Sequence, residues 1–213
     1  MNERLTLTEE EIEQLIGQVR ENPPMPAVMR IGSIDAPSAA PPVSASLIRI
    51  TADDLKATPP QRYNAPNLVE LETLMFGLLN SARQAHLPKW LGSPNLRWHE
   101  GLASVARGHS LDMLRRGYVD HTSPEGVKVA KRIDQSHIAY VACGENIGIV
   151  YGAASHSEQG VYEIHNAFMN QPRRLTNHRG NLLNPIWTHV GIGAAYDESG
   201  SLFITQNFIS KLG

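Results

Sequence analysis

Two of the nine histidines have neighbours that could bring an imidazole into a site. His121 opens the loop "HTSPEG" directly after the helix-ending run "RRGYVD", and His178 lies in "TNHRGNLLNP" after another break. Histidines in loops at the ends of elements can point into a cleft, where a neutral imidazole suits metal binding or proton transfer. Taken one at a time, each is more typical of an ordinary surface or loop histidine.

Glu145 is the third candidate, because it places a charge at the start of a segment that should be buried. It belongs to "CGENIGIVYG", in which β-branched and aromatic residues predict a strand. A carboxylate buried without partners costs several kcal/mol, so it must be paired, bonded to backbone or bound to a metal. The alternative is a structural glutamate that ties the "HTSP" loop through backbone hydrogen bonds.

The sequence contains none of the local motifs of common catalytic sites. HExxH, CxxC, a P-loop, GxSxG and a GxGxxG in a βαβ setting are all absent. Cys143 has an acid two residues away, which raises the pKa of a thiol and disfavours a nucleophilic role. We interpret Cys143 as a small buried residue.

Composition excludes several classes of protein. The net charge of −2 and the pI near 6.5 provide no basic field for nucleic acid. No apolar run reaches the roughly 18 residues of a membrane span, and a single cysteine cannot form an intramolecular disulfide. The first 19 residues contain five acids and no apolar core of a secretory signal. We expect either a cytoplasmic start or a leader that was replaced.

The N-terminal third differs from the rest of the chain. A capping box at Thr8 and apolar residues at helical spacing predict an amphipathic helix within residues 1–22. Residues 23–66 carry most of the prolines and predict a Pro/Ala-rich linker or wrapping arm. Alternation in residues 46–50 suggests an edge strand there.

Residues 67–213 carry the periodicity of a compact α+β domain. Helices are predicted from Asn67 onward, over 99–116, around 127–133 and from Ser157 to before Pro172. Residues 190–208 alternate on both sides of "DESG", which predicts a β-hairpin with one buried face, and "ENIGIVY" supplies a third strand.

Six motifs in order make residues 71–208 resemble the bacterial branch of the CAP superfamily, also called the SCP-like extracellular domain. They are "LLNSAR", "NLRWHEGLASVARGHSLDMLRRGYVDHTSPEG", "CGENI", "FMNQP", "HRGNLLNPIWTHVGIG" and "TQNF". The resemblance implies an α-β-α sandwich with a small central antiparallel sheet. It also implies a cleft with two histidines and two acids that in several members binds a divalent metal.

Carried over by position, the resemblance makes His121, Glu145 and His178 the candidate metal ligands. Two histidines, a glutamate and a water match the open four-coordinate pattern that zinc prefers in catalytic sites. Without metal, the same trio could act as acid and base around a substrate. The second acid of the family does not carry over, because Gln171 stands at its position.

These observations predict a noncatalytic binding module that takes a divalent metal, zinc being the expected ion, and a lipid or protein partner. The alternative is a metal-assisted, peptidase-like hydrolase in which Glu145 would be the catalytic residue. A third hypothesis has residues 1–66 docking on the domain or on a larger assembly. The resemblance implies an extracellular or cell-surface location, with no nucleic-acid partner expected.

Overall fold

The computed structural model describes residues 28–31, 65–88, 94–172, 174, 177–198 and 200–211. The predicted helix within residues 1–22, most of the 23–66 arm and the predicted strand at 46–50 lie outside these ranges. The predicted domain of residues 67–213 is described over most of its length.

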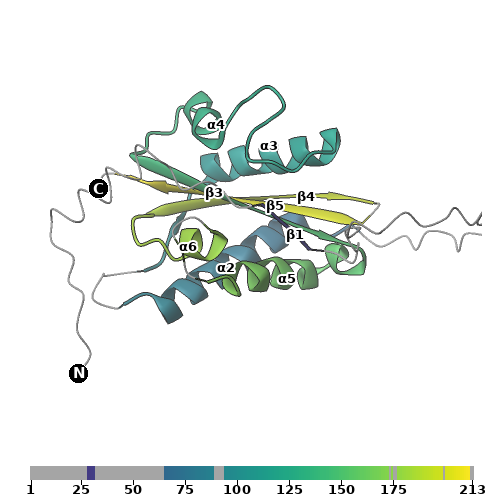
Figure 1. Ribbon diagram of the computed structural model, residues 1–213, viewed down its shortest axis with the longest axis horizontal. Helices are drawn as coiled ribbons and strands as arrows, with labels where there is room; N and C mark the ends of the chain where they lie inside the picture. The colour runs from purple at the N-terminus through teal and green to yellow at the C-terminus, as the bar shows by residue number, and fades with distance from the viewer. Residues whose placement is uncertain are drawn as a thin grey trace, which may run out of the picture.

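The described domain has three layers, with one sheet between two groups of helices (Figure 1). The strands are β1 (Val28–Ile31), β2 (Arg97–Trp98), β3 (Ala142–Tyr151), β4 (His189–Asp197) and β5 (Ser201–Ser210). Their order across the sheet is β1-β3-β5-β4-β2. The central strand β5 is antiparallel to both of its long neighbours, β3 and β4, and the short edge strands β1 and β2 are parallel to their neighbours. The predicted α-β-α sandwich is confirmed.

Helices cover both faces of this sheet. They are α2 (Leu68–His86), α3 (Glu100–Arg116), α4 (Val129–Gln135), α5 (Glu158–Met169) and α6 (His178–Leu182), with a short 3₁₀ helix η2 (Ala153–His156). Figure 1 shows α3 and α4 on one face and α2, α5 and α6 on the other. The hairpin was predicted to have one buried face, and this was wrong. Both faces of β4 and β5 are buried because each carries a layer of helices.

The ends of the long helices follow from local sequence. The Asn67 side chain accepts hydrogen bonds from the backbone N–H groups of Val69 and Glu70, which caps α2. Gly117 ends α3 in the left-handed conformation, with φ of 66°. Ser157 caps α5 by accepting from Gln159. These boundaries were predicted because capping depends on residues within one turn.

Helix α3 lies directly on strand β4, and two glycines make that approach possible. A Cβ built at Gly193 would lie 2.0 Å from the backbone nitrogen of Arg107, and one at Gly191 would lie 2.1 Å from that of Ala103. Any side chain here would push the helix off the sheet. This contact sets the position of α3, and with it the position of His109.

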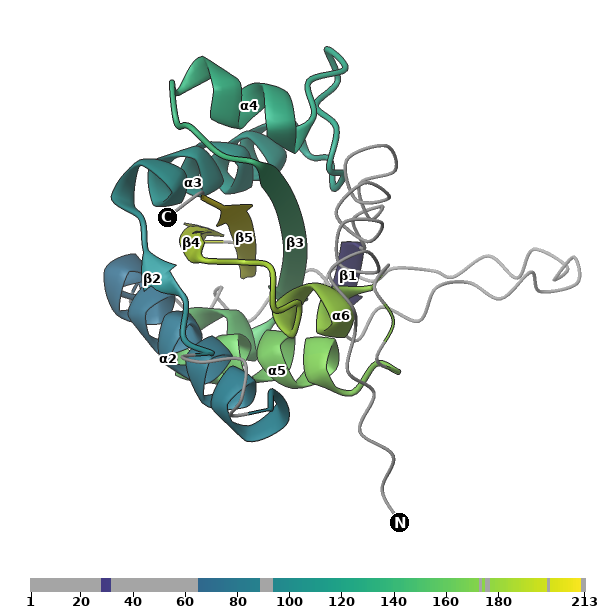
Figure 2. The same cartoon turned by 90° about the vertical axis from the view of Figure 1, so that its left-hand side faces the viewer.

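Strand β1 comes from the predicted wrapping arm and pairs with the outer edge of β3 (Figure 2). Val28 pairs with Ile147 and Ile31 pairs with Val150 in parallel register. Four residues of the N-terminal region therefore dock on the domain. Among the described residues, no helix combines the length and the apolar character needed to cross a membrane.

Candidate functional site

Strand β3 carries Glu145, the predicted acid, next to Asn146, and the side chains of these two residues point to opposite helix layers. Successive strand residues point to opposite faces of a sheet. Glu145 contacts α4 and the loop before it, whereas Asn146 contacts His178 at the start of α6. Because α4 and α6 cover different faces (Figure 1), Glu145 and His178 lie in different layers.

The Glu145 carboxylate is completely enclosed and hydrogen-bonded. Its side chain is 0% exposed. Oε1 lies 2.8 Å from Nδ1 of His121, and Oε2 lies 2.7 Å from Nη2 of Arg132. The Nε2 atom of His109 lies 3.9 Å from Oε1. Glu145 is thus the anion of a buried cluster with one permanent cation.

These partners decide the ionisation of the cluster. Burial alone raises the pKa of Glu145, but the hydrogen bond from His121 and the charge of Arg132 outweigh it and hold that pKa below its usual range. Burial lowers the pKa of His109, against the opposing attraction of Glu145. The cluster at neutral pH therefore contains an ionised carboxylate, an Arg132 cation and a neutral His109.

Two helices and one loop hold the cluster together. Arg132, on α4, donates from Nη1 to the carbonyl oxygens of His121 and Val127 at 3.1 and 2.9 Å. His109, on α3, contacts the carbonyl oxygen of Asp120 at 3.0 Å through Nε2. The loop that carries His121 is therefore attached to both helices. The alternative role expected for Glu145 was to tie this loop through backbone hydrogen bonds, whereas Glu145 bonds the loop through the His121 side chain.

Sequence reasoning did not identify Arg132 or His109 as members of this cluster. His109 lies on the inward stripe of α3 with Val105, Ala106 and Met113, which was a usable signal for a buried histidine. Arg132 precedes Ile133, the buried residue of α4, and nothing in that short helix indicates a partner thirteen residues later in the chain.

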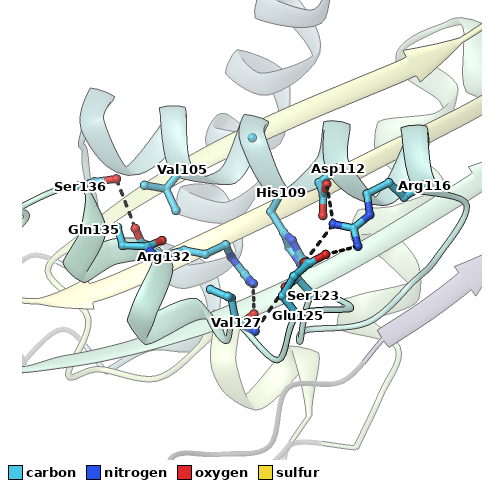
Figure 3. A pocket seen from close by; sticks show the side chains of 11 residues that line it. Val105, His109, Asp112, Arg116, Ser123, Glu125, Val127, Arg132, Gln135 and Ser136 are labelled. Carbon is cyan, nitrogen blue, oxygen red and sulfur yellow. Dashed lines mark hydrogen bonds and ion pairs between the residues drawn. The ribbon is translucent and has the colours of Figure 1, made fainter.

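His109 and Arg132 also line a polar pocket of about 420 Å³ on the outer side of the cluster (Figure 3). Arg116 lies across the pocket and forms ion pairs with Asp112 and Glu125. The charged groups of the wall are paired with one another, so the pocket carries no concentrated charge of either sign.

His178 is held by a separate set of contacts in the α5–α6 layer. Its ring stacks on Phe168, with centroids 4.3 Å apart and planes 8° apart. Nδ1 of His178 lies 2.9 Å from Nε2 of Gln171, and the His178 backbone N–H donates to Oε1 of Gln171 at 3.0 Å. Gln171, which stands where the family has its second acid, is therefore a direct partner of this histidine.

Buried amides attach the segment after His178 to the sheet. Asn146 donates to Gln206 at 3.1 Å and accepts from Asn181 at 3.0 Å, and Trp187 donates to Asn181. The contacts of Asn146 and Gln206 are those of structural hydrogen-bonding residues that link the sheet to α6.

Cys143 is less buried than we interpreted from the sequence. The thiol is half-buried. Burial raises its pKa to about 11, a tyrosine hydrogen bond opposes the shift, and the Glu145 charge adds to it. A thiol with a raised pKa is a poor nucleophile at neutral pH.

The three predicted ligands His121, Glu145 and His178 are not arranged to bind one shared metal ion. Both oxygens of Glu145 already accept hydrogen bonds, and the Arg132 cation beside them would repel a second cation. Across the described part of the chain, no group of three or more His, Cys, Asp or Glu side chains is arranged to hold a metal. The structure brings His121 and Glu145 together and places His178 in the other layer. Zinc binding stays a prediction.

Comparison with known proteins identifies the family of this chain. Residues 76–208 match the cysteine-rich secretory protein family, CAP. The chain is 35% identical over 149 residues to YkwD of Bacillus subtilis, an alignment that covers 70% of this chain and 51% of YkwD. The chain thus spans about half the length of that relative.

Two solved structures share the fold. An extracellular protein with an SCP domain from Bacillus anthracis superposes with a TM-score of 0.54 at 31% identity, covering 68% of this chain and 41% of that one. An outer surface protein of Borrelia burgdorferi superposes with a TM-score of 0.56 at 14% identity, covering 70% and 99%. With the family match spanning more than half of its residues, this chain belongs to the cysteine-rich secretory protein (CAP) family.

Proposed function

We propose that this protein is a noncatalytic binding module of the CAP family. The observation that carries the proposal is the sealed state of Glu145, whose side chain is 0% exposed and whose two oxygens are bonded to His121 and Arg132. A general base must reach the proton that it removes, directly or through one water. An enclosed carboxylate that already accepts two hydrogen bonds is suited to holding a loop in place.

The ligand surface that we propose is the α2 groove, a groove of about 540 Å³ between α2 and α5. Its lining is mixed: Val69, Leu74, Gly77 and Leu78 are apolar or small, and Glu70, Thr73, Ser81 and Glu158 are polar. Its volume is in the usual range of small-molecule sites, about 300–1,000 Å³. Val69 is 63% exposed, which is high for a large apolar side chain. The apolar side chains of this groove suit the acyl chain of a lipid, which is one of the two partner classes predicted from the family resemblance, a lipid or a protein.

Gly77 provides a direct test of the α2 groove. A Cβ at Gly77 meets no atom within 4 Å, so Gly77→Leu fills the groove without moving the backbone. The change should also stabilise α2, by up to about 1 kcal/mol, because glycine is a poor helix former. We expect fluorescently labelled hexadecanoic acid to bind the unaltered protein and to lose at least tenfold in affinity in Gly77→Leu.

The matched control is Gly108→Leu. Gly108 also lies in a long helix, and a Cβ there meets no atom within 4 Å, but it lines the polar pocket on the opposite face. This variant should bind the labelled fatty acid normally. Absence of binding to the unaltered protein, or equal losses in the two variants, would refute the lipid assignment.

The hydrolase alternative makes a different prediction. If Glu145 activated water, a panel of peptides and esters would contain a substrate whose turnover disappears in Glu145→Gln while the variant remains folded. We expect no such turnover. A substrate with that behaviour would replace the binding-module proposal.

We also propose an extracellular or cell-surface location. The support is the Bacillus anthracis protein, which is described as extracellular and shares 31% identity with this chain. Fractionation of producing cells with detection by antibody tests it, and recovery of the protein in the cytosol alone would contradict it.

A further inference from the structure

The two histidines of the predicted site are each held at Nδ1, but by groups of opposite hydrogen-bonding character. His121 faces the carboxylate of Glu145 at 2.8 Å. His178 faces the amide nitrogen of Gln171 at 2.9 Å. A carboxylate accepts hydrogen bonds, whereas an amide nitrogen donates them. The two rings must therefore carry their protons on different atoms.

The orientation of the Gln171 amide is determined by a backbone group. The N–H of His178 donates to Oε1 of Gln171 at 3.0 Å. A backbone N–H can only donate, so the amide oxygen must occupy this position. Reversing the amide would place its NH₂ group against the backbone N–H, so that two donors would face each other and the backbone hydrogen bond would be lost. The NH₂ group therefore points at Nδ1 of His178.

The His178 ring has little freedom to avoid this contact. It is 1% exposed and stacks on Phe168. Turning the ring over would present a carbon to the Gln171 NH₂ group and leave a buried donor unsatisfied, which costs about 1–3 kcal/mol. Nδ1 is thus the acceptor of this bond, and a neutral imidazole with an unprotonated Nδ1 carries its proton on Nε2.

We propose that Gln171 is a positioning residue that fixes His178 as the Nε2–H tautomer, so that this histidine donates to an oxygen acceptor such as a water or a carbonyl and does not bind a metal ion. Metal-binding histidines typically donate from one ring nitrogen to a carboxylate, carbonyl or water and ligate through the other. His121 has this polarity toward Glu145, whereas His178 has the reverse. The inference stands independently of the proposed lipid groove.

The proton positions can be measured directly. Long-range ¹H–¹⁵N correlation spectra of the uniformly labelled full chain distinguish the two neutral tautomers, and His178→Gln assigns the ring signals by their loss. We expect the Nε2–H form for His178 and the Nδ1–H form for His121 near neutral pH. A spectrum with Nδ1–H for His178 would overturn the proposal. This measurement needs no variant at Gln171.

Gln171→Glu tests the cause. A carboxylate at this position can accept from both the backbone N–H and Nδ1–H, so the His178 spectrum should switch to the Nδ1–H tautomer. Gln171→Leu keeps a side chain of similar size but removes both bonds, so it controls for the loss of the Gln171 hydrogen bonds without a new acceptor. A switch in Gln171→Glu supports the proposal, whereas an unchanged Nε2–H spectrum in the folded variant contradicts it.

Zinc titration supplies the second readout. We expect any zinc uptake by the unaltered chain, measured by calorimetry, to be unchanged in His178→Ala, because the Nε2–H tautomer offers no lone pair there. Replacing a residue that only supports a metal ligand usually lowers metal affinity by about 10–100-fold. A loss of zinc affinity of more than about 100-fold in His178→Ala would therefore show that His178 is itself a ligand and would overturn the proposal.

Discussion

The guanidinium of Arg132 lies 2.7 Å from the carboxylate of Glu145, and together they form an ion pair in the layer of α3 and α4. Arg132 also bonds the carbonyl oxygen of His121, whose ring bonds the other oxygen of Glu145. The acid that the family resemblance assigns to a metal site is, in this chain, one member of a closed triangle of three residues, Glu145, His121 and Arg132. Substitutions that break this triangle should therefore destabilise the domain.

Removing the cation should destabilise the fold strongly. Arg132→Met leaves Glu145 as a buried charge without a counter-charge, and breaking a buried pair from one side costs about 3–5 kcal/mol. Urea unfolding at neutral pH measures the loss. Arg116→Met is the matched control, because Arg116 is 37% exposed and pairs with partly or largely exposed acids, so its loss should be small. Equal losses would show that the triangle has no special stability.

Replacing Gly193 should separate α3 from the sheet. The new methyl group of Gly193→Ala would lie 2.0 Å from the Arg107 nitrogen, and overpacking of this kind costs typically about 1–3 kcal/mol, occasionally more. Gly77→Ala adds the same group in open space and should instead stabilise α2, by about 0.8–1 kcal/mol. Thermal unfolding followed by circular dichroism should shift in opposite directions. A neutral Gly193→Ala would mean that α3 lies further from β4.

A buried histidine should make the domain sensitive to mild acid. His165, on α5, is buried, and its burial lowers its pKa. Below the usual histidine pKa of about 6.5, the unfolded chain binds a proton that the folded chain does not. The stability that neutral His165 contributes to the fold is therefore fully present above about pH 6.5. It is lost as the pH falls through the lowered pKa that His165 has in the folded protein.

The free energy of unfolding, measured in urea at several values between about pH 7.5 and about pH 5, tests this sign. His165→Gln should flatten the decline, whereas His86→Gln, at an exposed position of α2, should leave it unchanged. An identical slope in the His165 variant would exclude this histidine as the source of acid sensitivity.

Removing the docked strand should expose a sheet edge. Residues 28–31 cover the outer edge of β3 from Ile147 to Val150, and an unpaired edge is a template for pairing with another chain. A chain of residues 67–213 should fold but self-associate, as measured by light scattering. A chain of residues 28–213, which keeps β1, should behave like the full chain. Equal, monomeric behaviour of the two truncated chains would show that β1 does not protect this edge.

The fold was largely predictable because its signals are local. Asn67, Gly117 and Ser157 end helices through contacts within one turn, and the alternation around "DESG" defines the hairpin without any distant residue. The short edge strands β1 and β2 were not predicted. Each is held by a neighbour far along the chain, and two to four residues carry no periodicity of their own.

The candidate site was predictable only in part of its membership. Residue types and family resemblance identified His121, Glu145 and His178, and Gln171 as the departure at the second acid. Arg132 was missed, since ion pairing between a short helix and a strand leaves no sequence pattern. His109 was also missed, although its place on the inward stripe of α3 indicates a buried histidine.

The amino-acid sequence by itself determined the helices α2, α3, α4 and α5, the hairpin, the family and the positions able to carry chemistry, because these depend on side-chain type and short-range spacing. The tertiary structure decided that Glu145 is sealed by Arg132, that His178 lies in the other helix layer, and that Gln171 presents a donor to its ring. Those three results depend on which face of a strand a side chain occupies and on the direction of single hydrogen bonds. Both are set by how distant segments pack.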